Sequence, residues 1–332
     1  MKTEIFYLKV LRDRVPIVCW VAAVALLTSG CGSDAQSFLD PKGPIAEAQK
    51  SHFIRVIWLS MLAAGPVFLL VPLMLWRYRY KNKRASYTPN WEFSARLDAV
   101  MWGIPFLIIF SLSVQLWHST KALDPYRPID PERTPLDIQV VGLDWKWLFI
   151  YPEYGVASIG EMAFPVGTPV SLVLTSDTVM QSFLISPLAG QIYTMPGMQT
   201  KLYIKADAVG VFEGENTQFN GDGFAGQKFK AIALSNHEFE SWIENARSVG
   251  VRLDKTTYAR LAQRSSKAQV HQVFANAQMP EGITYFNRIN RGLYQSVIDR
   301  YHTGENIPMT EQPGGVLYRV PAPPDTTPQL HK

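Results

Sequence analysis

The stretch VIWLSMLAAGPVFLLVPLMLW, residues 56–76, contains no charged side chain. As a helix, its 21 residues would be about 32 Å long at ~1.5 Å per residue, which matches a hydrocarbon core of ~30 Å. Residues 99–117 form a second uncharged apolar run, in which Trp102 and Trp117 are placed to lie near the two membrane interfaces. The two runs predict a pair of membrane-spanning helices and exclude a purely cytosolic protein.

Charges around these runs predict their direction across the membrane. Between them, residues 77–96 hold six basic side chains and a single acidic one, Glu92. Loops rich in Lys and Arg stay on the cytoplasmic side. We therefore expect a transmembrane hairpin over residues 54–118 with its loop at 77–96 in the cytoplasm, and everything after His118 outside.

The N-terminus has the layout of a secretory signal. A basic start and a short apolar core, residues 17–27, precede small residues and Cys31. This core is too short to span a bilayer. A cysteine directly after Gly30 resembles the bacterial lipobox, which implies a signal peptide over 1–30, a palmitate-type lipid on Cys31 and an outer arm over 31–53. The alternative is that Cys31 is merely a small apolar residue near a cleavage site.

Composition excludes several classes of protein. The net charge is +4 and the pI is near 8.9, but much of the basic excess lies at the N-terminus and between the two apolar runs. That placement indicates membrane topology and not nucleic-acid binding. The chain has only two cysteines, so a disulfide framework is excluded.

The outer half of the chain has a different pattern. After a linker at 119–134, residues 135–235 show short period-2 apolar segments separated by Gly and Pro, which predicts an antiparallel sandwich or barrel. Helical spacing returns at Phe239, Trp242, Ile243 and Ala246. We expect a helical arm over 236–303, with a second helix at about 291–301, and a disordered Pro-rich tail over 304–332.

Several stretches of this sequence resemble those of one known protein family. The stretch GLDWKWLFIYPEYG, residues 142–155, together with the lipobox and the two spans, resembles subunit II of the haem–copper respiratory oxidases. Three further segments resemble sequences of the quinol-oxidase branch, of the bo type: LDPKGPIA (39–46), YTPNW (87–91) and MPGMQTKL (195–202). The resemblance implies a membrane-anchored all-β protein: a transmembrane hairpin, a periplasmic cupredoxin-like Greek-key β-sandwich and a helical C-terminal extension.

The cytochrome c branch of that family binds a dinuclear copper A centre through thiolate, imidazole, thioether and carbonyl ligands. The resemblance places other residue types at all six of its ligand positions in this sequence: Gln181, Asn216, Gln218, Asn220, Phe224 and Gln227. No His or Cys occurs from Pro135 to Asn236. We therefore expect no metal, no cofactor and no catalytic residue in the outer domain. Trp145 matches an aromatic that passes electrons into copper A, and here core packing is the favoured role.

The function implied by the resemblance is that of a non-catalytic subunit II in a proton-pumping ubiquinol oxidase of a bacterial inner membrane. Subunit I would carry haem b, a second high-spin haem and copper B, and subunits III and IV would be further partners. Quinol would be the electron donor, with no role for cytochrome c or nucleic acid. Two alternatives stay open: a cytochrome c oxidase subunit II, and a free-standing periplasmic lipoprotein.

Overall fold

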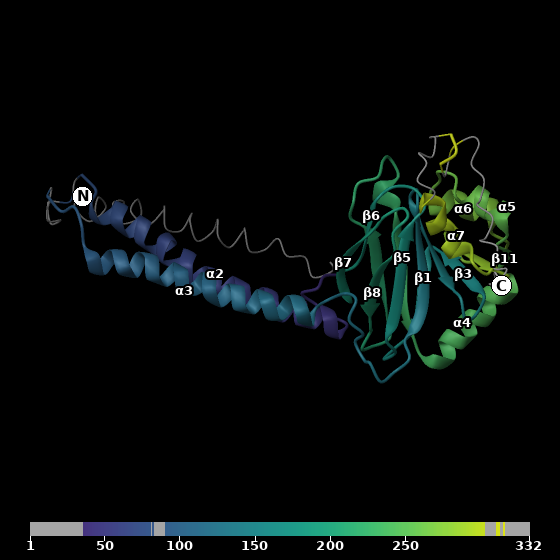
Figure 1. The fold of residues 1–332 in the computed structure, drawn as a ribbon, viewed down its shortest axis with the longest axis horizontal. Coiled ribbons are helices and arrows are strands. Elements are labelled where there is room, and N and C mark those ends of the chain that lie inside the picture. Colours follow the sequence, from purple (N-terminus) through teal and green to yellow (C-terminus); the bar gives the residue numbers. More distant parts are fainter. Residues whose placement is uncertain (1–35, 81, 83–89, 303–309, 313–314, 316–332) are drawn as a thin grey trace, which may run out of the picture. The chain divides into compact units, whose positions relative to one another are not determined.

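The computed structural model describes residues 36–80, 82, 90–302, 310–312 and 315. The predicted signal peptide, Cys31 and almost all of the predicted tail lie outside these residues. Within them, the chain forms a helical hairpin, two packed β-sheets and a C-terminal set of helices (Figure 1).

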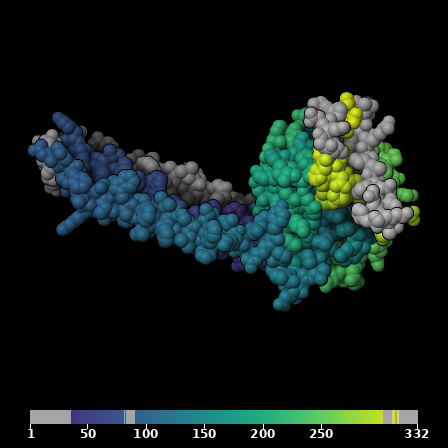
Figure 2. All heavy atoms as spheres, in the orientation of Figure 1, coloured from purple at the N-terminus to yellow at the C-terminus, as the bar shows by residue number. Residues whose placement is uncertain are grey.

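The hairpin consists of α2 (Pro44–Arg77) and α3 (Ala95–Ala122). Pro44 at the first helical position starts α2, where a missing N–H costs nothing. Both helices are long and apolar enough to cross a membrane, and their most apolar windows are 0% and 6% buried within the described chain. Figure 2 shows the visible face of α3 uncovered along most of its length. Both helices extend beyond the uncharged runs, and α2 takes in part of the predicted arm.

The sandwich has one sheet of seven strands and one of five. The larger sheet has the order β11-β12-β3-β2-β1-β5-β8 and is built from β1 (Leu136–Leu143), β2 (Lys146–Tyr151), β3 (Val156–Ile159), β5 (Val170–Ser176), β8 (Thr200–Ile204), β11 (Val251–Arg252) and β12 (Thr284–Asn287). The smaller sheet has the order β4-β10-β9-β6-β7 and is built from β4 (Glu161–Pro165), β6 (Gln181–Ile185), β7 (Ala189–Thr194), β9 (Gly210–Asn216) and β10 (Lys228–Leu234).

The predicted sandwich of two sheets after two apolar helices is confirmed, with two corrections. The sheets are mixed and not purely antiparallel, because β1 pairs with β5 in parallel and β4 pairs with β10 in parallel. In each case the intervening chain passes through the opposite sheet, so the returning strand runs in the same direction. The C-terminal arm is also not all helix, since β11 and β12 extend the larger sheet next to β3.

Aromatic residues fill the core between the sheets. Trp147 on β2 meets Phe183 on β6 edge to face at 5.2 Å, and Phe183 stacks on Phe229 of β10 at 5.1 Å. Such pairs stabilise a core by about 0.5–1.5 kcal/mol beyond the burial of their area. The residues of this core are therefore contributed by both sheets.

The other face of the larger sheet is covered as well. A second apolar cluster joins Leu143, Leu148 and Ile150 to residues of the C-terminal helices. The helices of this extension are α4 (Asn236–Val249), α5 (Lys255–Leu261), α6 (Lys267–Phe274), α7 (Leu293–Asp299) and the short 3-10 helix η2 (Arg300–His302). Because β2 is buried on both faces, its sequence KWLFIY lacks the alternation of a half-exposed strand.

Side-chain caps set the starts of several helices in the extension. Ser235 and Glu238 form a capping box at the start of α4, and Ser266 and Gln269 form another at α6. Asp254 accepts the Thr257 N–H at 2.8 Å and caps α5. Caps of this kind contribute about 1 kcal/mol each.

Candidate functional site

Three segments meet at one end of the sandwich: the turn between β1 and β2, the loop between β5 and β6, and the loop between β9 and β10. The six positions that the resemblance aligns with copper ligands belong to the second and third of these segments or to their strand ends. Strand pairing brings them together, because β6 pairs with β9 and β9 pairs with β10. The loop after β9 contains the 3-10 helix η1 (Phe224–Gly226).

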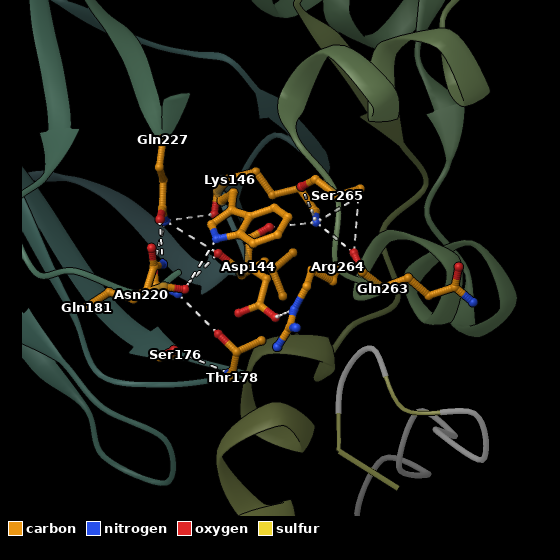
Figure 3. A network of polar contacts seen from close by, with 12 residues as sticks. Asp144, Lys146, Ser176, Thr178, Gln181, Asn220, Gln227, Gln263, Arg264 and Ser265 are labelled. Carbon is orange, nitrogen blue, oxygen red and sulfur yellow. Dashed lines mark hydrogen bonds and ion pairs between the residues drawn. The ribbon is translucent and has the colours of Figure 1, made fainter. Parts of the chain in front are cut away.

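Four of the six predicted positions form one hydrogen-bonded group, here called the amide cluster: Gln181, Asn216, Asn220 and Gln227. Nε2 of Gln227 donates to Oε1 of Gln181 at 2.6 Å, while Oε1 of Gln227 accepts from Nδ2 of Asn220 at 2.7 Å and from Nδ2 of Asn216 at 3.1 Å. Gln181 and Gln227 are 0% and 1% exposed. Figure 3 shows the side chains of Gln181, Asn220 and Gln227 converging.

The amide cluster also binds main-chain groups of all three segments. Gln181 donates to the Leu143 carbonyl at 3.1 Å and to the Thr178 hydroxyl at 3.1 Å. Oδ1 of Asn216 accepts the Ser182 N–H at 2.9 Å. A hydrogen bond contributes a net ~1 kcal/mol, but a buried partner left without one costs about 1–3 kcal/mol. The cluster therefore cross-links the three segments through neutral groups.

The other two predicted positions do not join the amide cluster through their side chains. Gln218 takes part through its main chain, which donates to Oδ1 of Asn216 at 3.0 Å and accepts from its Nδ2 at 2.7 Å. Phe224 lies in η1, where its ring meets Phe219 at 5.7 Å. The sequence resemblance identified the six positions, but it did not indicate which of them would bind one another through their side chains.

The donor set of the amide cluster does not fit a copper pair. Its atoms are neutral amide oxygens and nitrogens already engaged with one another, whereas copper in electron-transfer sites takes thiolate, imidazole and thioether ligands. Among the described residues, no group of three or more His, Cys, Asp or Glu side chains could hold a metal ion. The arrangement can cross-link loops, and it offers no group that titrates near neutral pH.

Trp145 lies between the amide cluster and the C-terminal extension. Its φ of 65° places a bulky residue in the left-handed region, which costs of order 1 kcal/mol and needs support from its surroundings. The indole Nε1 donates to the Asn220 carbonyl at 3.2 Å, and Arg264 lies 5.7 Å from the ring. A Cβ on Gly223 would be 2.1 Å from a ring atom, so only glycine permits this close approach. Trp145 therefore packs against the β9–β10 loop and Arg264.

Sequence reasoning missed the role of Lys146, the neighbour of Trp145. Four oxygens lie within hydrogen-bond distance of its Nζ and share its N–H groups: the carbonyls of Asp144 (3.1 Å), Gln263 (2.9 Å) and Ser265 (3.0 Å), and the Ser265 hydroxyl (3.0 Å). Figure 3 shows this group beside the amide cluster. Burial lowers the pKa of Lys146 to about 7, partly offset by the Asp144 carboxylate. The signal in the sequence is a single charged residue, Lys146, at the start of strand β2, whose other side chains are apolar or aromatic.

Three carboxylates of the sandwich also hold the extension. Asp144 pairs with Arg264 at 3.1 Å. The fully buried Asp177 pairs with Arg300 and accepts a hydrogen bond from the Tyr258 hydroxyl at 2.7 Å. The buried carboxylate of Glu161 accepts from Trp242 and Tyr285, both at 2.6 Å.

Together with Lys146, these carboxylates form what we call the extension anchors: Asp144, Lys146, Glu161 and Asp177. Each of them lies in the sandwich and binds groups from the C-terminal extension. Burial raises the pKa of the Tyr285 hydroxyl far above its ordinary value, and the neighbouring Glu161 carboxylate raises it further. The extension is therefore bound to the sandwich as part of the same domain.

Curated relatives match most of the chain. It is 41% identical over 276 residues to the cytochrome bo(3) ubiquinol oxidase subunit 2 of Pseudomonas putida, covering 83% of both chains. It is 38% identical to the ubiquinol oxidase subunit 2 of Acetobacter aceti, covering 84% of this chain and 86% of that one. It is 33% identical to the quinol oxidase subunit 2 of Bacillus subtilis, covering 74% and 76%. No protein-family model matches the chain.

Solved structures match a smaller part of this chain, and their sequence identity to it is lower. The periplasmic domain of subunit II of the cytochrome oxidase of Bradyrhizobium japonicum matches with a TM-score of 0.32 and 24% identity, covering 34% of this chain and 93% of that one. A haem–copper terminal oxidase chain matches with a TM-score of 0.34 and 18% identity, covering 42% of this chain and all of that one.

Proposed function

Since this chain belongs to the subunit 2 family of the bacterial ubiquinol oxidases, we propose that it is the non-catalytic subunit of its oxidase and binds no copper in its outer domain. The observation that carries this proposal is the amide cluster, where neutral side chains hydrogen-bonded to one another stand at the positions that the resemblance aligns with the copper ligands of the cytochrome c branch. A free-standing periplasmic lipoprotein is not favoured, because the relatives are oxidase subunits over most of the chain.

The amide cluster explains why quinol suits this chain as the electron donor of the complex. A water-soluble donor protein needs a relay on the water side, and a copper pair would supply one by accepting and passing single electrons. Quinol is already dissolved in the bilayer and can deliver its electrons directly to a haem in subunit I. We place haem b, a second high-spin haem and copper B in that subunit.

The two apolar helices support a membrane-anchored placement, with subunit I as the main partner and subunits III and IV as further ones. The exposed apolar surface of α2 and α3 would contact lipid and subunit I. The charge pattern of residues 77–96 favours a cytoplasmic loop and a periplasmic outer domain in an inner membrane.

Purification of the oxidase from native membranes tests the proposal. We expect the tagged chain to copurify with a very hydrophobic haem-bearing partner, and oxygen uptake to be driven by quinol and not by reduced cytochrome c. A colourless preparation without that partner would contradict the assignment and favour the lipoprotein alternative. Uptake driven by cytochrome c would indicate a cytochrome c oxidase.

Lipidation of Cys31 stays a separate proposal that rests on the lipobox alone. Because two spans already hold the chain in the membrane, Cys31→Ser should leave the protein membrane-bound and the complex assembled. Mass spectrometry of the N-terminal peptide would detect the acyl groups. An unmodified Cys31 on a chain with an uncleaved signal would contradict the lipobox interpretation.

A further inference from the structure

Guanidinium groups gather where α2 ends and α3 begins, which we call the inner end of the hairpin. Arg77 is the last residue of α2, Arg79 follows two residues later, and Arg96 lies in the first turn of α3. The acidic residues nearest to them in sequence are Glu92 and Asp98. Within the described residues, none of the three arginines forms an ion pair. Their charge is therefore not balanced by this part of the chain.

The helix dipoles account for only one of these charges. A cation in the last turn of a helix, such as Arg77, is stabilised by the partial negative charge of the helix C-terminus. Arg79 lies beyond the end of α2, and Arg96 lies at a helix N-terminus, where the dipole disfavours a cation. Arg79 and Arg96 therefore gain no stabilisation from the helices that carry or precede them.

Hydrogen bonds hold the chain in a turn directly after α2. The Tyr78 N–H donates to the Met74 carbonyl at 2.8 Å, and the Asn82 N–H donates to the Arg79 carbonyl at 2.8 Å. Nδ2 of Asn82 also donates to the Arg77 carbonyl at 2.5 Å. The backbone that carries Arg77 and Arg79 is therefore folded against the end of the helix.

Aromatic rings lie beside both guanidinium groups. The guanidinium carbon of Arg79 lies 5.8 Å from the centre of the Trp76 ring, and that of Arg77 lies 6.0 Å from the centre of the Tyr78 ring. Trp76 is 65% exposed and Tyr78 is 62% exposed. Trp and Tyr are enriched at membrane interfaces, and Trp76 is the last residue of the uncharged run. The two arginines are thus placed at the depth of lipid headgroups.

The chemistry of the guanidinium group indicates which ligand fits this place. Arg binds phosphate through two parallel N–H···O bonds, and phosphates are present in the headgroup layer of a membrane. A zwitterionic headgroup carries a cation that offsets its phosphate, whereas an anionic headgroup does not. Basic clusters directly beside a membrane span attract anionic lipids. The unbalanced positive charge of the inner end therefore favours an anionic phospholipid.

The outer end of the hairpin lacks this excess of positive charge. Lys121 lies 4.4 Å from the Trp117 ring, so a cation and an aromatic ring meet there as well. Residues 118–134, however, hold three basic and three acidic side chains, and Arg133 pairs with Asp130 at 3.4 Å. Residues 77–96 hold six basic side chains and one acidic one. The preference for an anionic headgroup is therefore specific to the inner end.

We propose that Arg77 and Arg79, with the Trp76 and Tyr78 rings beside them, bind the phosphate of an anionic phospholipid of the surrounding membrane, and that Arg96 adds positive charge to this site. The inference rests on the proposed placement of the hairpin across a membrane. It adds a lipid of stated chemistry as a bound partner of this chain.

Photolabelling of the whole purified oxidase in phosphatidylcholine vesicles tests the site. The vesicles contain a trace of phosphatidylglycerol with a photoreactive diazirine at the start of one acyl chain, or the same probe with a choline headgroup. Mass spectrometry of the labelled peptides identifies the labelled positions. We expect the glycerol probe to label the last two turns of α2 at least about fivefold more strongly than the choline probe, since even one basic residue near an anionic surface changes binding about fivefold.

Arg77→Gln combined with Arg79→Gln should remove most of this preference. We expect labelling by the glycerol probe to fall at least about fivefold, because two basic residues are lost. Lys121→Gln is the matched control, since it removes a cation that lies against a tryptophan at the other end of the hairpin. It should leave labelling of the last turns of α2 unchanged. The weaker labelling by the choline probe should be equal in all three proteins, which reports that each hairpin is inserted.

Salt dependence in the unaltered protein gives a readout that needs no variant. Raising the ionic strength from about 0.01 M to about 1 M shortens the range of exposed charges from about 30 Å to about 3 Å. Labelling by the glycerol probe should fall toward that by the choline probe, which should not change. Labelling by the glycerol probe that does not depend on salt would overturn the inference, and this test decides the matter if the double variant does not insert.

The remaining outcomes separate this inference from the proposed function. Equal labelling by the two probes, or unchanged labelling in the double variant, would overturn the lipid site while an oxidase with its haem-bearing partner leaves the proposed function standing. Displacement of the probe by inorganic phosphate, but not by sodium chloride of equal ionic strength, would also overturn it, because the ligand would then be free phosphate. A chain that keeps the lipid preference without a haem-bearing partner would contradict the proposed function alone.

Discussion

The amide cluster and the extension anchors both bind segments that are far apart in sequence, but they use different chemistry. The amide cluster joins three segments of the sandwich through neutral side chains. The extension anchors join the sandwich to the C-terminal helices through a buried lysine and buried carboxylates. The loops at this end of the sandwich are thus cross-linked without charge, while attachment of the extension depends on ionisable groups taken out of water.

The largest expected effect comes from breaking the buried pair of Asp177 and Arg300. Asp177→Asn keeps the shape of the side chain but leaves the Arg300 guanidinium, whose side chain is 9% exposed, without its counter-charge. Loss of one partner of a buried pair costs about 3–5 kcal/mol. Hydrogen exchange of α7 in the purified full chain would measure the loss as faster local opening.

Asp130→Asn provides the matched control for this substitution. Asp130 pairs with Arg133 at 3.4 Å with both side chains substantially exposed, and such pairs contribute at most about 1 kcal/mol. If the two variants changed hydrogen exchange equally little, α7 would not depend on the buried pair, and the distinction between the two regions would fail.

A smaller effect is expected inside the amide cluster. Gln227→Leu removes both the donor to Gln181 and the acceptor for Asn216 and Asn220, so buried amide groups are left unpaired at a cost of about 1–3 kcal/mol. Hydrogen exchange of the β9–β10 loop should rise, with α5 to α7 unchanged. Gln263→Leu, at an exposed side chain, is the control. Equal loosening of the extension in Gln227→Leu would show that the two regions are not separable.

Titration of Lys146 sharpens the comparison further. Because burial lowers its folded pKa to about 7 from 10.5, the unfolded state binds more protons between these values, and stability rises with pH by at most about 1.4 kcal/mol per unit. Tyrosines with raised pKa values oppose this only above about pH 9. Between pH 7 and 9, opening of the Gln263–Ser266 segment should become less frequent. Lys146→Met should weaken that dependence and leave only the part from Lys267, whose pKa burial also lowers, and an unchanged pH profile in the variant would exclude Lys146 as its source.

The smallest effect is expected at Arg264. Its side chain is 68% exposed, so its ion pair with Asp144 and its contact with the Trp145 ring together contribute about 1 kcal/mol or less. Arg264→Ala should raise oxidation of Trp145 in hydroxyl-radical footprinting, followed by mass spectrometry, without releasing α5 or α6. Release of those helices would show that Arg264, and not Lys146, holds the segment.

Much of the fold followed from local pattern. The two uncharged runs predicted both long helices, and Phe239, Trp242, Ile243 and Ala246 predicted α4 because their spacing follows one helix face. The parallel pairing of β1 with β5 could not be predicted, since strand direction depends on where the intervening chain passes. The strands β11 and β12 were also missed, because they are short and depend on distant partners: β12 pairs with the edge of β3, and β11 pairs with β12.

The candidate site was predictable in its positions but not in its contacts. The resemblance identified six substituted ligand positions, and the structure joins four of them through their side chains. That Gln218 takes part through its main chain depends on the turn after β9, which residue types do not specify. The four oxygens around Lys146 come from segments more than a hundred residues apart, so no local pattern could indicate them.

The most direct test of the central claim is the copper content and electron paramagnetic resonance spectrum of the intact purified oxidase. Because the amide cluster offers only neutral amide groups that already bind one another, we predict no signal from a thiolate-bridged copper pair and no copper assigned to this chain, before or after incubation with copper ions. A thiolate-bridged copper signal that persists in the isolated full-length chain would contradict the account.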